Sequence, residues 1–215
     1  MKHFLDLTHR IEEGMPVFPG DVQPKIEQTM TLGKDICTVQ SIRFSNHLGT
    51  HLDAPSHFIE GGMTVDQIPL ATLIGTAVIL DFTDKGEGDV ITRADLERHR
   101  HRLEPGARVL LKTGWDGNFR PGVFYEDFPC LTVGAAQYLA STRAGLLGMD
   151  TPSPSPLDDP GQAIHKILLG AGVVILEAVK NLTMITVDEC ELIVLPPPFR
   201  NFSGAPCRVV AVVED

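Results

Sequence analysis

Three histidines and an aspartate lie within the segment 47–57, which reads His-Leu-Gly-Thr-His-Leu-Asp-Ala-Pro-Ser-His. His47, His51, Asp53 and His57 are separated by even numbers of residues, so an extended chain directs all four side chains to one side. Imidazole nitrogen and carboxylate oxygen together suit Zn²⁺, Mn²⁺ or Fe²⁺, and two histidines with one carboxylate leave coordination positions open. The spacing therefore predicts a catalytic metal site.

The four residues need not all bind metal. Three ligands suffice for a catalytic ion, so His57 is either a fourth ligand or the proton-transfer group, because an unperturbed imidazole pKa of about 6.5 lies near neutral pH. The alternative for the whole segment is a polar loop with solvated histidines, and the shared parity of the four side chains argues against it.

Two residues farther along the chain are weaker candidates. Glu177 lies in the otherwise apolar run 173–179, where a carboxylate is costly to desolvate unless a cation or hydrogen-bond donors meet it. Glu177 either meets a metal ion or points outward at a strand end, and the local sequence leaves both open. His165 lies in a helical pattern, where a histidine satisfied within the helix is the more common case.

Short strands must position these residues. The segment 47–57 itself is strand and loop, because Gly49, Thr50 and Pro55 all oppose a helix and Gly49 can supply a bend. The run 173–176 is apolar on both faces, as in a buried strand, whereas 41–45 alternates as a half-exposed strand does. Eight strands are predicted over residues 3–7, 39–46, 76–82, 108–113, 145–149, 173–178, 191–195 and 208–213.

Helix patterns occur between the strands. One helix is expected to have Asp159 as N-cap and Pro160 as its first residue, and to end at Gly170. A second begins at Thr92 with Asp95 three residues on, and a third covers 133–141. Because no repeat or long linker divides the chain, we predict a single α/β domain with a mixed β-sheet, spanning residues 1–215.

Composition excludes several classes of function. The 18 Lys+Arg and 28 Asp+Glu give a net charge of −10, which argues against binding nucleic acid or an anionic membrane surface. No apolar run approaches the ~20 residues that span a bilayer, and the N-terminus lacks the pattern of a signal peptide. We therefore expect a cytoplasmic protein with a small-molecule substrate. No Gly-x-Ser-x-Gly, dinucleotide-loop or phosphate-loop motif is present, which argues against a serine hydrolase and against nucleotide cofactors.

The segment His47-x-Gly-Thr-His-x-Asp-Ala-Pro-x-His-Phe58 resembles the signature of the metal-dependent cyclase family, which includes bacterial kynurenine formamidases. The resemblance continues through residues 17–21, 61–62, 66–69, 113–115, 150–153, 165–166 and 177–182. It implies a swivelling β/β/α-type domain and a homodimer or a dimer of dimers. It also implies hydrolysis of an amide or formamide C–N bond by metal-activated water, without a covalent enzyme intermediate.

The resemblance also implies a ligand set. His47, His51 and Asp53 would bind a first metal ion, while Asp53 and Glu177 would bridge to a second ion that His165 also binds. Relatives that keep a single ion lack the bridging glutamate, so Glu177 favours two ions per subunit. Zinc is the expected metal, with manganese as the alternative.

His57 would be the acid and base of the reaction by the same resemblance. Kynurenine formamidases resemble one another in placing Trp before a Pro-Gly-Asp turn, where it can pack on the aromatic substrate, and this chain has Phe18 there. Three functions are therefore open: a formamidase acting on an aryl formamide such as N-formylkynurenine, a relative hydrolysing another cyclic or linear amide or ester, and a non-enzymatic metal-binding protein.

Overall fold

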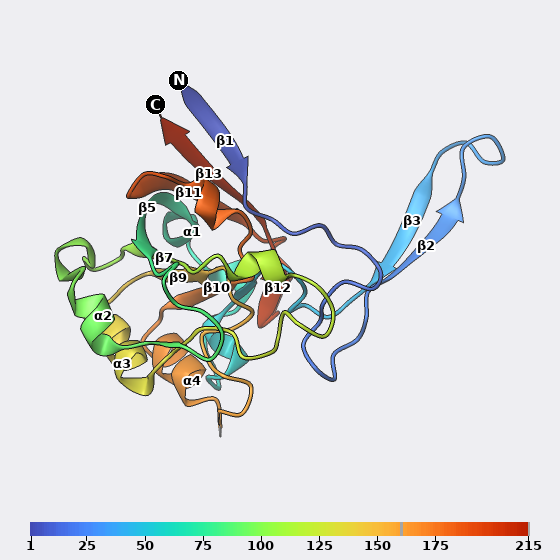
Figure 1. Cartoon of the computed structure of the whole chain (residues 1–215). Helices are drawn as coiled ribbons and strands as arrows, with labels where there is room; N and C mark the ends of the chain where they lie inside the picture. Colours follow the sequence, from blue (N-terminus) through green and yellow to red (C-terminus); the bar gives the residue numbers. More distant parts are fainter. Residues whose placement is uncertain (160, 215) are drawn as a thin grey trace.

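The computed structural model describes residues 1–159 and 161–214. Within them, a nine-stranded mixed sheet forms the body of the molecule (Figure 1). Its strands, in spatial order, are β1 (Lys2–Asp6), β13 (Arg208–Glu214), β11 (Glu189–Leu195), β5 (Ile74–Asp81), β7 (Arg108–Lys112), β9 (Leu146–Met149), β10 (Val174–Glu177), β4 (His51–Asp53) and β12 (Gly204–Pro206). β5, β7, β9 and β10 are mutually parallel, and the other pairs are antiparallel. This architecture confirms the predicted α/β fold with a mixed sheet.

Three of the helices cover one side of the sheet, and α3 contacts both α2 and α4 (Figure 1). The α-helices of the described chain are α1 (Leu70–Leu73), α2 (Arg93–Glu97), α3 (Val133–Thr142) and α4 (Ala163–Gly170). Short 3₁₀ turns occur at Pro55–His57, Val65–Gln67, Arg100–Arg102, Trp115–Asn118 and Leu182–Met184. No helix of the described chain has the length and apolarity needed to cross a membrane.

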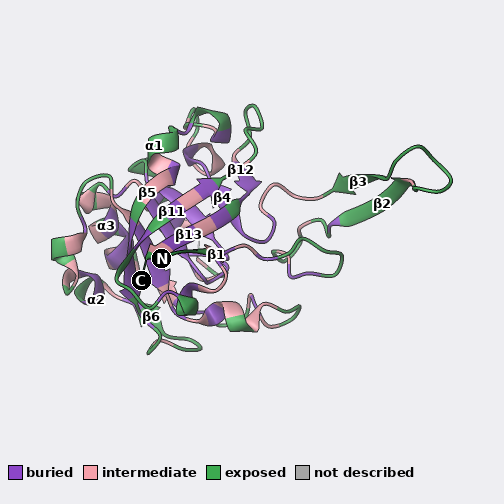
Figure 2. Ribbon diagram, turned by 90° about the horizontal axis from the view of Figure 1, so that it is seen from above, coloured by how far each residue is buried: buried purple, intermediate pink, exposed green. Residues whose placement is uncertain are grey.

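The sheet separates two apolar cores. One contains Leu52 of β4 and Leu176 of β10, and the other contains Ile175 of β10 with Leu139 and Leu168 from α3 and α4. Figure 2 shows the central strands as buried. Because neighbouring side chains of a strand point to opposite faces, the residues flanking Leu52 and Leu176 face the helices.

The eight predicted strands are all present, with ends shifted by a few residues. The prediction that 41–45 is half-exposed was wrong, because β3 (Val39–Arg43) is exposed along its whole length (Figure 2). β3 pairs only with β2 (Lys25–Met30) among the described strands, and this two-stranded arm projects from the body (Figure 1). The unpredicted strands are β2, β6 (Val90–Ile91), β8 (Cys130–Leu131) and β12.

The start of α4 differs from the prediction. Pro160 lies outside the described residues, and the helix begins at Ala163 with Gln162 as N-cap. Gly161 and Gln162 have positive φ values of 75° and 52°, so the chain turns there instead of continuing a helix from Asp159. The Asp159 carboxylate still accepts a hydrogen bond of 3.3 Å from the Ile164 N–H.

The other two helices confirm their predictions. Thr92 and Asp95 form the expected reciprocal cap at the start of α2. The third helix, predicted over 133–141, is α3.

Candidate metal centre

β4 carries the first candidate ligands. Its middle residue, Leu52, is fully buried in the core beneath the sheet, so His51 and Asp53 on either side point to the helix-covered face. Gly49 has a φ of 58° and bends the chain ahead of β4, as predicted, which brings His47 back towards Asp53. The His47 Nδ1 atom lies 2.7 Å from the Asp53 Oδ1 atom.

β10 and α4 bring the remaining candidates. Glu177 lies directly opposite His51 in the antiparallel pairing of β10 with β4, and their Oε2 and Nε2 atoms are 3.3 Å apart. His165 lies on α4 with its Nε2 atom 3.2 Å from Glu177 Oε1 and 3.9 Å from Asp53 Oδ2. All five predicted ligands therefore converge at one place.

The centre is buried and rich in carboxylate. Asp53 and Glu177 are only 1% and 6% exposed, and no Lys or Arg of the described chain forms an ion pair with either. Two buried carboxylates faced only by imidazoles are expensive to desolvate without a cation. The nitrogen and oxygen donors fit a divalent metal such as Zn²⁺ or Mn²⁺.

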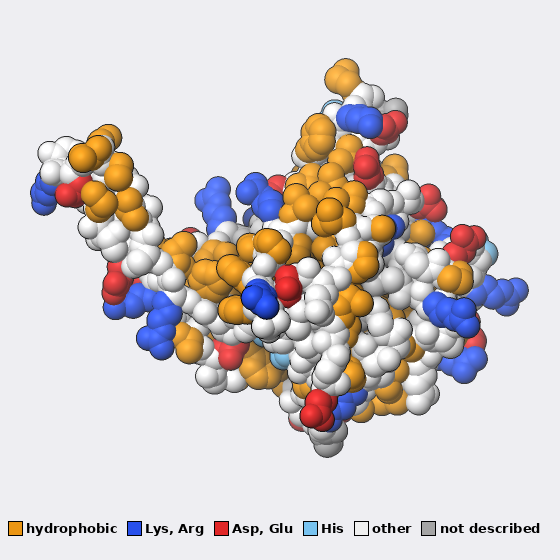
Figure 3. Space-filling view, turned by 180° about the vertical axis from the view of Figure 1, so that it is seen from behind, with side chains coloured by type: hydrophobic (Ala, Val, Ile, Leu, Met, Phe, Trp, Pro, Cys, Tyr) orange, Lys and Arg blue, Asp and Glu red, His pale blue; other side chains and the backbone are white. Residues whose placement is uncertain are grey.

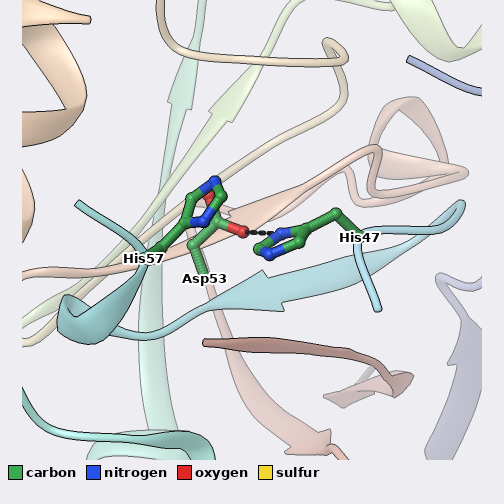
Figure 4. Close-up of side chains that lie close together, drawn as sticks. All are labelled: His47, Asp53 and His57. Atoms are coloured by element: carbon green, nitrogen blue, oxygen red, sulfur yellow. Dashed lines mark hydrogen bonds and ion pairs between the residues drawn. The ribbon is translucent and has the colours of Figure 1, made fainter. Parts of the chain in front are cut away.

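Two sets of three residues offer ligand atoms within 4.8 Å of one another: His47, Asp53 and His57, and His51, Asp53 and Glu177. Asp53 belongs to both sets. Figure 4 shows His47 and His57 beside the Asp53 carboxylate, and the two rings are stacked with centroids 4.0 Å apart. The resemblance implies the sets His47, His51 and Asp53, and Asp53, Glu177 and His165. In the structure His57 takes the place of His51 in the first set and His51 that of His165 in the second, while His165 stays 3.2 Å from Glu177.

The pKa values of the ligands reflect this crowding. Burial opposes the ionisation of Asp53, but the neighbouring His47 and His51 hold its pKa well below the usual range. Burial likewise opposes protonation of His51 and His165, but nearby carboxylates raise the pKa of each imidazole. The pKa of His57 is lowered to about 4, chiefly by burial, so this ring is neutral at pH 7.

The second ring nitrogens of two candidate ligands, His51 and His165, are held by the protein. His51 Nδ1 donates to the Gly49 carbonyl at 2.8 Å, and His165 Nδ1 lies 3.0 Å from the hydroxyl of the buried Ser155. These contacts leave both Nε2 atoms directed at the carboxylates. Ser155 was not predicted, because nothing in its local sequence distinguishes it from its serine neighbours.

Thr50 fixes the turn that follows Glu177. The Thr50 hydroxyl accepts a hydrogen bond of 2.9 Å from the His9 N–H and donates one of 2.6 Å to the Ala178 carbonyl. Ala178 has a φ of 52°, an uncommon conformation for a residue with a Cβ atom. The hydroxyl therefore ties the N-terminal segment and the strand of Glu177 to the strand of His51.

Gly204 permits the close approach of β12 to the centre. It lies opposite Asp53 in the pairing of β12 with β4, and a Cβ atom there would collide with the ring of His47. The sequence pattern had not singled out this glycine, because its partner is 157 residues away.

A cavity of about 430 Å³ opens above the centre and is lined by all of the predicted ligands and by His57. Phe18 lines it as well, with its ring in an edge-to-face contact with Tyr125, at 6.0 Å between centroids and 87° between planes. Tyr125 was not predicted as a site residue. Such aromatic walls favour a flat ring as the bound group.

The sequence and the structure of this chain are similar to those of known proteins. A family model described as "Putative cyclase" matches residues 5–156. The kynurenine formamidase of Bacillus cytotoxicus is 31% identical over 208 residues, which are 96% of each chain. The structure of a predicted metal-dependent hydrolase from Bacillus stearothermophilus has a TM-score of 0.84 at 31% identity and covers 99% of this chain and 98% of that one. Isatin hydrolase A from Labrenzia aggregata, solved with benzyl benzoate, has a TM-score of 0.90 at 26% identity, covering 100% and 94%.

Proposed function

Because the chain belongs to the putative cyclase family, we propose that it is a metal-dependent hydrolase that cleaves the C–N bond of an aryl formamide with water, as a kynurenine formamidase would. The observation that carries this proposal is the convergence of five ligand side chains, from β4, β10, α4 and the segment before β4, on one aromatic-walled cavity. A cavity of about 430 Å³ suits a small molecule.

We assign the ligands as the family resemblance implies. His47, His51 and Asp53 would hold one ion, and Asp53 and Glu177 would bridge to a second that His165 also binds. We propose zinc for both ions, with manganese as the alternative, and the membership of Asp53 in two ligand sets supports a bridging role. When bound, such an ion lowers the pKa of water from 15.7 to about 7 and polarises a carbonyl oxygen.

We assign His57 as the acid and base. Its ring lines the cavity and stacks on His47 at the edge of the centre. A ring nitrogen of His57 would accept a proton from the attacking water and deliver it to the nitrogen of the departing amine. Phe18 and Tyr125 would hold the aryl ring and exclude water from it.

A second candidate is the opening of a cyclic amide. The likeness to isatin hydrolase A, with a TM-score of 0.90, favours this alternative. It would use the same ligands and the same proton transfer by His57. The two candidates differ in the shape of the substrate and not in the chemistry of the residues.

We further propose that the chain acts in the cytoplasm, as one domain of residues 1–215 in a homodimer. The β2–β3 arm supports the dimer, because an isolated two-stranded hairpin is only marginally stable in water. Its apolar residues Leu32, Ile36 and Ile42 are 71%, 94% and 57% exposed. Figure 3 shows hydrophobic side chains gathered on the arm and on the body next to it, a surface that a second copy would cover.

Metal analysis followed by activity assays tests the proposed function. Protein purified without added metal should contain zinc or manganese, and it should turn over an aryl formamide, a cyclic amide or both. His57→Ala should keep the metal content and lower kcat by about 10²–10⁴-fold, whereas His51→Ala should lose metal. Metal binding without turnover of any amide or ester would instead favour the non-enzymatic protein, and loss of metal from His57→Ala would contradict its assignment.

A further inference from the structure

The cavity has an uneven distribution of charge. Among the described residues that line the cavity, the ionisable side chains outside the metal-binding cluster are His57, Tyr125 and Asp21, and only Asp21 is a carboxylic acid. No lysine or arginine lines the cavity, and all of its lining residues belong to the described chain. Outside the metal centre, a substrate side chain therefore meets a single carboxylate and no lysine or arginine.

Asp21 is held beside Phe18 by a tight turn. Its N–H donates to the Phe18 carbonyl at 2.9 Å, and Gly20 within the turn has a φ of 96°. The Asp21 carboxylate makes no hydrogen bond or ion pair with any described residue, although it is partly buried. An unpaired carboxylate in the wall of a cavity is available to a ligand.

Tyr125 relates Asp21 to the metal centre. Burial raises the pKa of Tyr125, and the carboxylates of Glu177 and Asp21 raise it further. The phenol lines the same cavity as both carboxylates, and its ring contacts Phe18. An aryl ring against Phe18 and Tyr125, with its amide at the metal centre, would direct its other substituent towards Asp21.

We propose that this cavity selects aromatic amides whose side chain carries an ammonium group bound by Asp21, and that it disfavours side chains that carry only a carboxylate. The inference rests on the proposed function and specifies its substrate class. A carboxylate in this place would lie near Asp21 without a lysine or arginine to pair with, and juxtaposed like charges reduce affinity. An ammonium group would instead form a charge-assisted hydrogen bond.

Four aryl formamides with the same ring test the selection. Their ortho side chains end in an ammonium group, in an ammonium and a carboxylate, in a neutral methyl group, and in a carboxylate. We expect kcat/KM for the ammonium compound to exceed that of the neutral one about tenfold, as for one charge-assisted hydrogen bond. The carboxylate compound should be the poorest.

Asp21→Asn should lower the ratio of kcat/KM for the ammonium over the neutral compound about tenfold. Asp84→Asn is the matched control, because Asp84 is exposed and lies outside the cavity lining, and its replacement removes the same charge. That variant should preserve the ratio. Equal kcat/KM values for the ammonium and carboxylate compounds, or an Asp21→Asn ratio within about twofold of the wild-type ratio, would overturn the inference.

Binding of the corresponding ring amines, measured by calorimetry on the metal-loaded protein, separates this inference from the proposed function. If no formamide is hydrolysed, the proposed function fails, and the amines still report the charge preference. Tighter binding of the ammonium-bearing amine, lost in Asp21→Asn, supports selection by Asp21. Binding of the carboxylate-bearing amine with equal affinity overturns it.

Discussion

Replacement of Thr50 by valine should damage both the stability of the fold and the affinity of the metal centre. Valine has nearly the same shape as threonine but lacks the hydroxyl, so the His9 N–H and the Ala178 carbonyl would lose their partner. Thr50 is 2% exposed, and water cannot easily replace it. Each buried group left without a hydrogen bond costs about 1–3 kcal/mol, so with two such groups we expect the free energy of unfolding to fall by about 2–6 kcal/mol.

The effect on the metal follows from the position of Ala178. This residue directly follows Glu177 and keeps a positive φ while its carbonyl is held by Thr50. Without the hydroxyl the turn can relax and Glu177 can move away from His51, so we expect the affinity for zinc to fall about tenfold, as for other residues that orient ligands. Competition with a fluorescent chelator measures this affinity, and urea unfolding measures the stability.

Two controls make the experiment decisive. Thr50→Ser keeps the hydroxyl and should retain most of the stability and metal affinity. Thr92→Val removes a hydroxyl that also makes two hydrogen bonds, with the carboxylate and the N–H of Asp95, at the start of α2 and outside the cavity lining. It should lower stability and leave metal affinity unchanged. If Thr50→Val binds zinc as tightly as Thr50→Ser does, Thr50 does not position Glu177.

Three further results are expected. Ser155→Ala should weaken zinc binding about 10–100-fold by releasing His165 Nδ1, whereas unchanged affinity in a titration would show that the packing of α4 alone orients the ring. Burial, with a smaller effect of Lys180, lowers the pKa of His9 from 6.5 to about 4, so the unfolded chain binds a proton more readily between these values. The stability that the neutral His9 ring contributes is complete above pH 6.5 and is lost as the pH falls through 4, a decrease of about 3 kcal/mol in the free energy of unfolding measured with urea. A decrease of the same size in His9→Phe would show that His9 is not its source. Removal of metal by a chelator should lower the melting temperature in calorimetry, because the Asp53 and Glu177 carboxylates lose their cation, and added zinc should restore it.

The clustering of the candidate ligands in the segment 47–57 could be predicted because their geometry is local. Alternation along a strand places His51 and Asp53 on one face, and Gly49 allows His47 to return to that face. The local sequence of Glu177 left open a metal contact or an outward-pointing strand end, and only the structure shows that its carboxylate is buried beside the imidazoles.

The rest of the site depends on pairings between distant segments. The register that sets Glu177 opposite His51 cannot be read from either strand alone, because many registers bury the same apolar residues. Ser155 and Tyr125 act through contacts made by loops, where no periodicity marks the inward side. The start of α4 was misplaced because an Asp-Pro pair is a strong helix signal, which the turn at Gly161 and Gln162 overrides.

The arrangement of the sheet makes the metal centre depend on strands that are synthesised after all of its candidate ligands. β4 pairs on one side with β10 and on the other with β12, and β13 inserts between β1 and β11. While the ribosome still holds residues 204–214, β1 has no neighbour, one edge of β4 is open, and Gly204 is not yet in place beside His47. A nascent chain therefore presents its cluster of histidines and carboxylates without the support of β12 until residue 206 emerges, and stalled fragments that end before β12 should bind the metal ion less tightly.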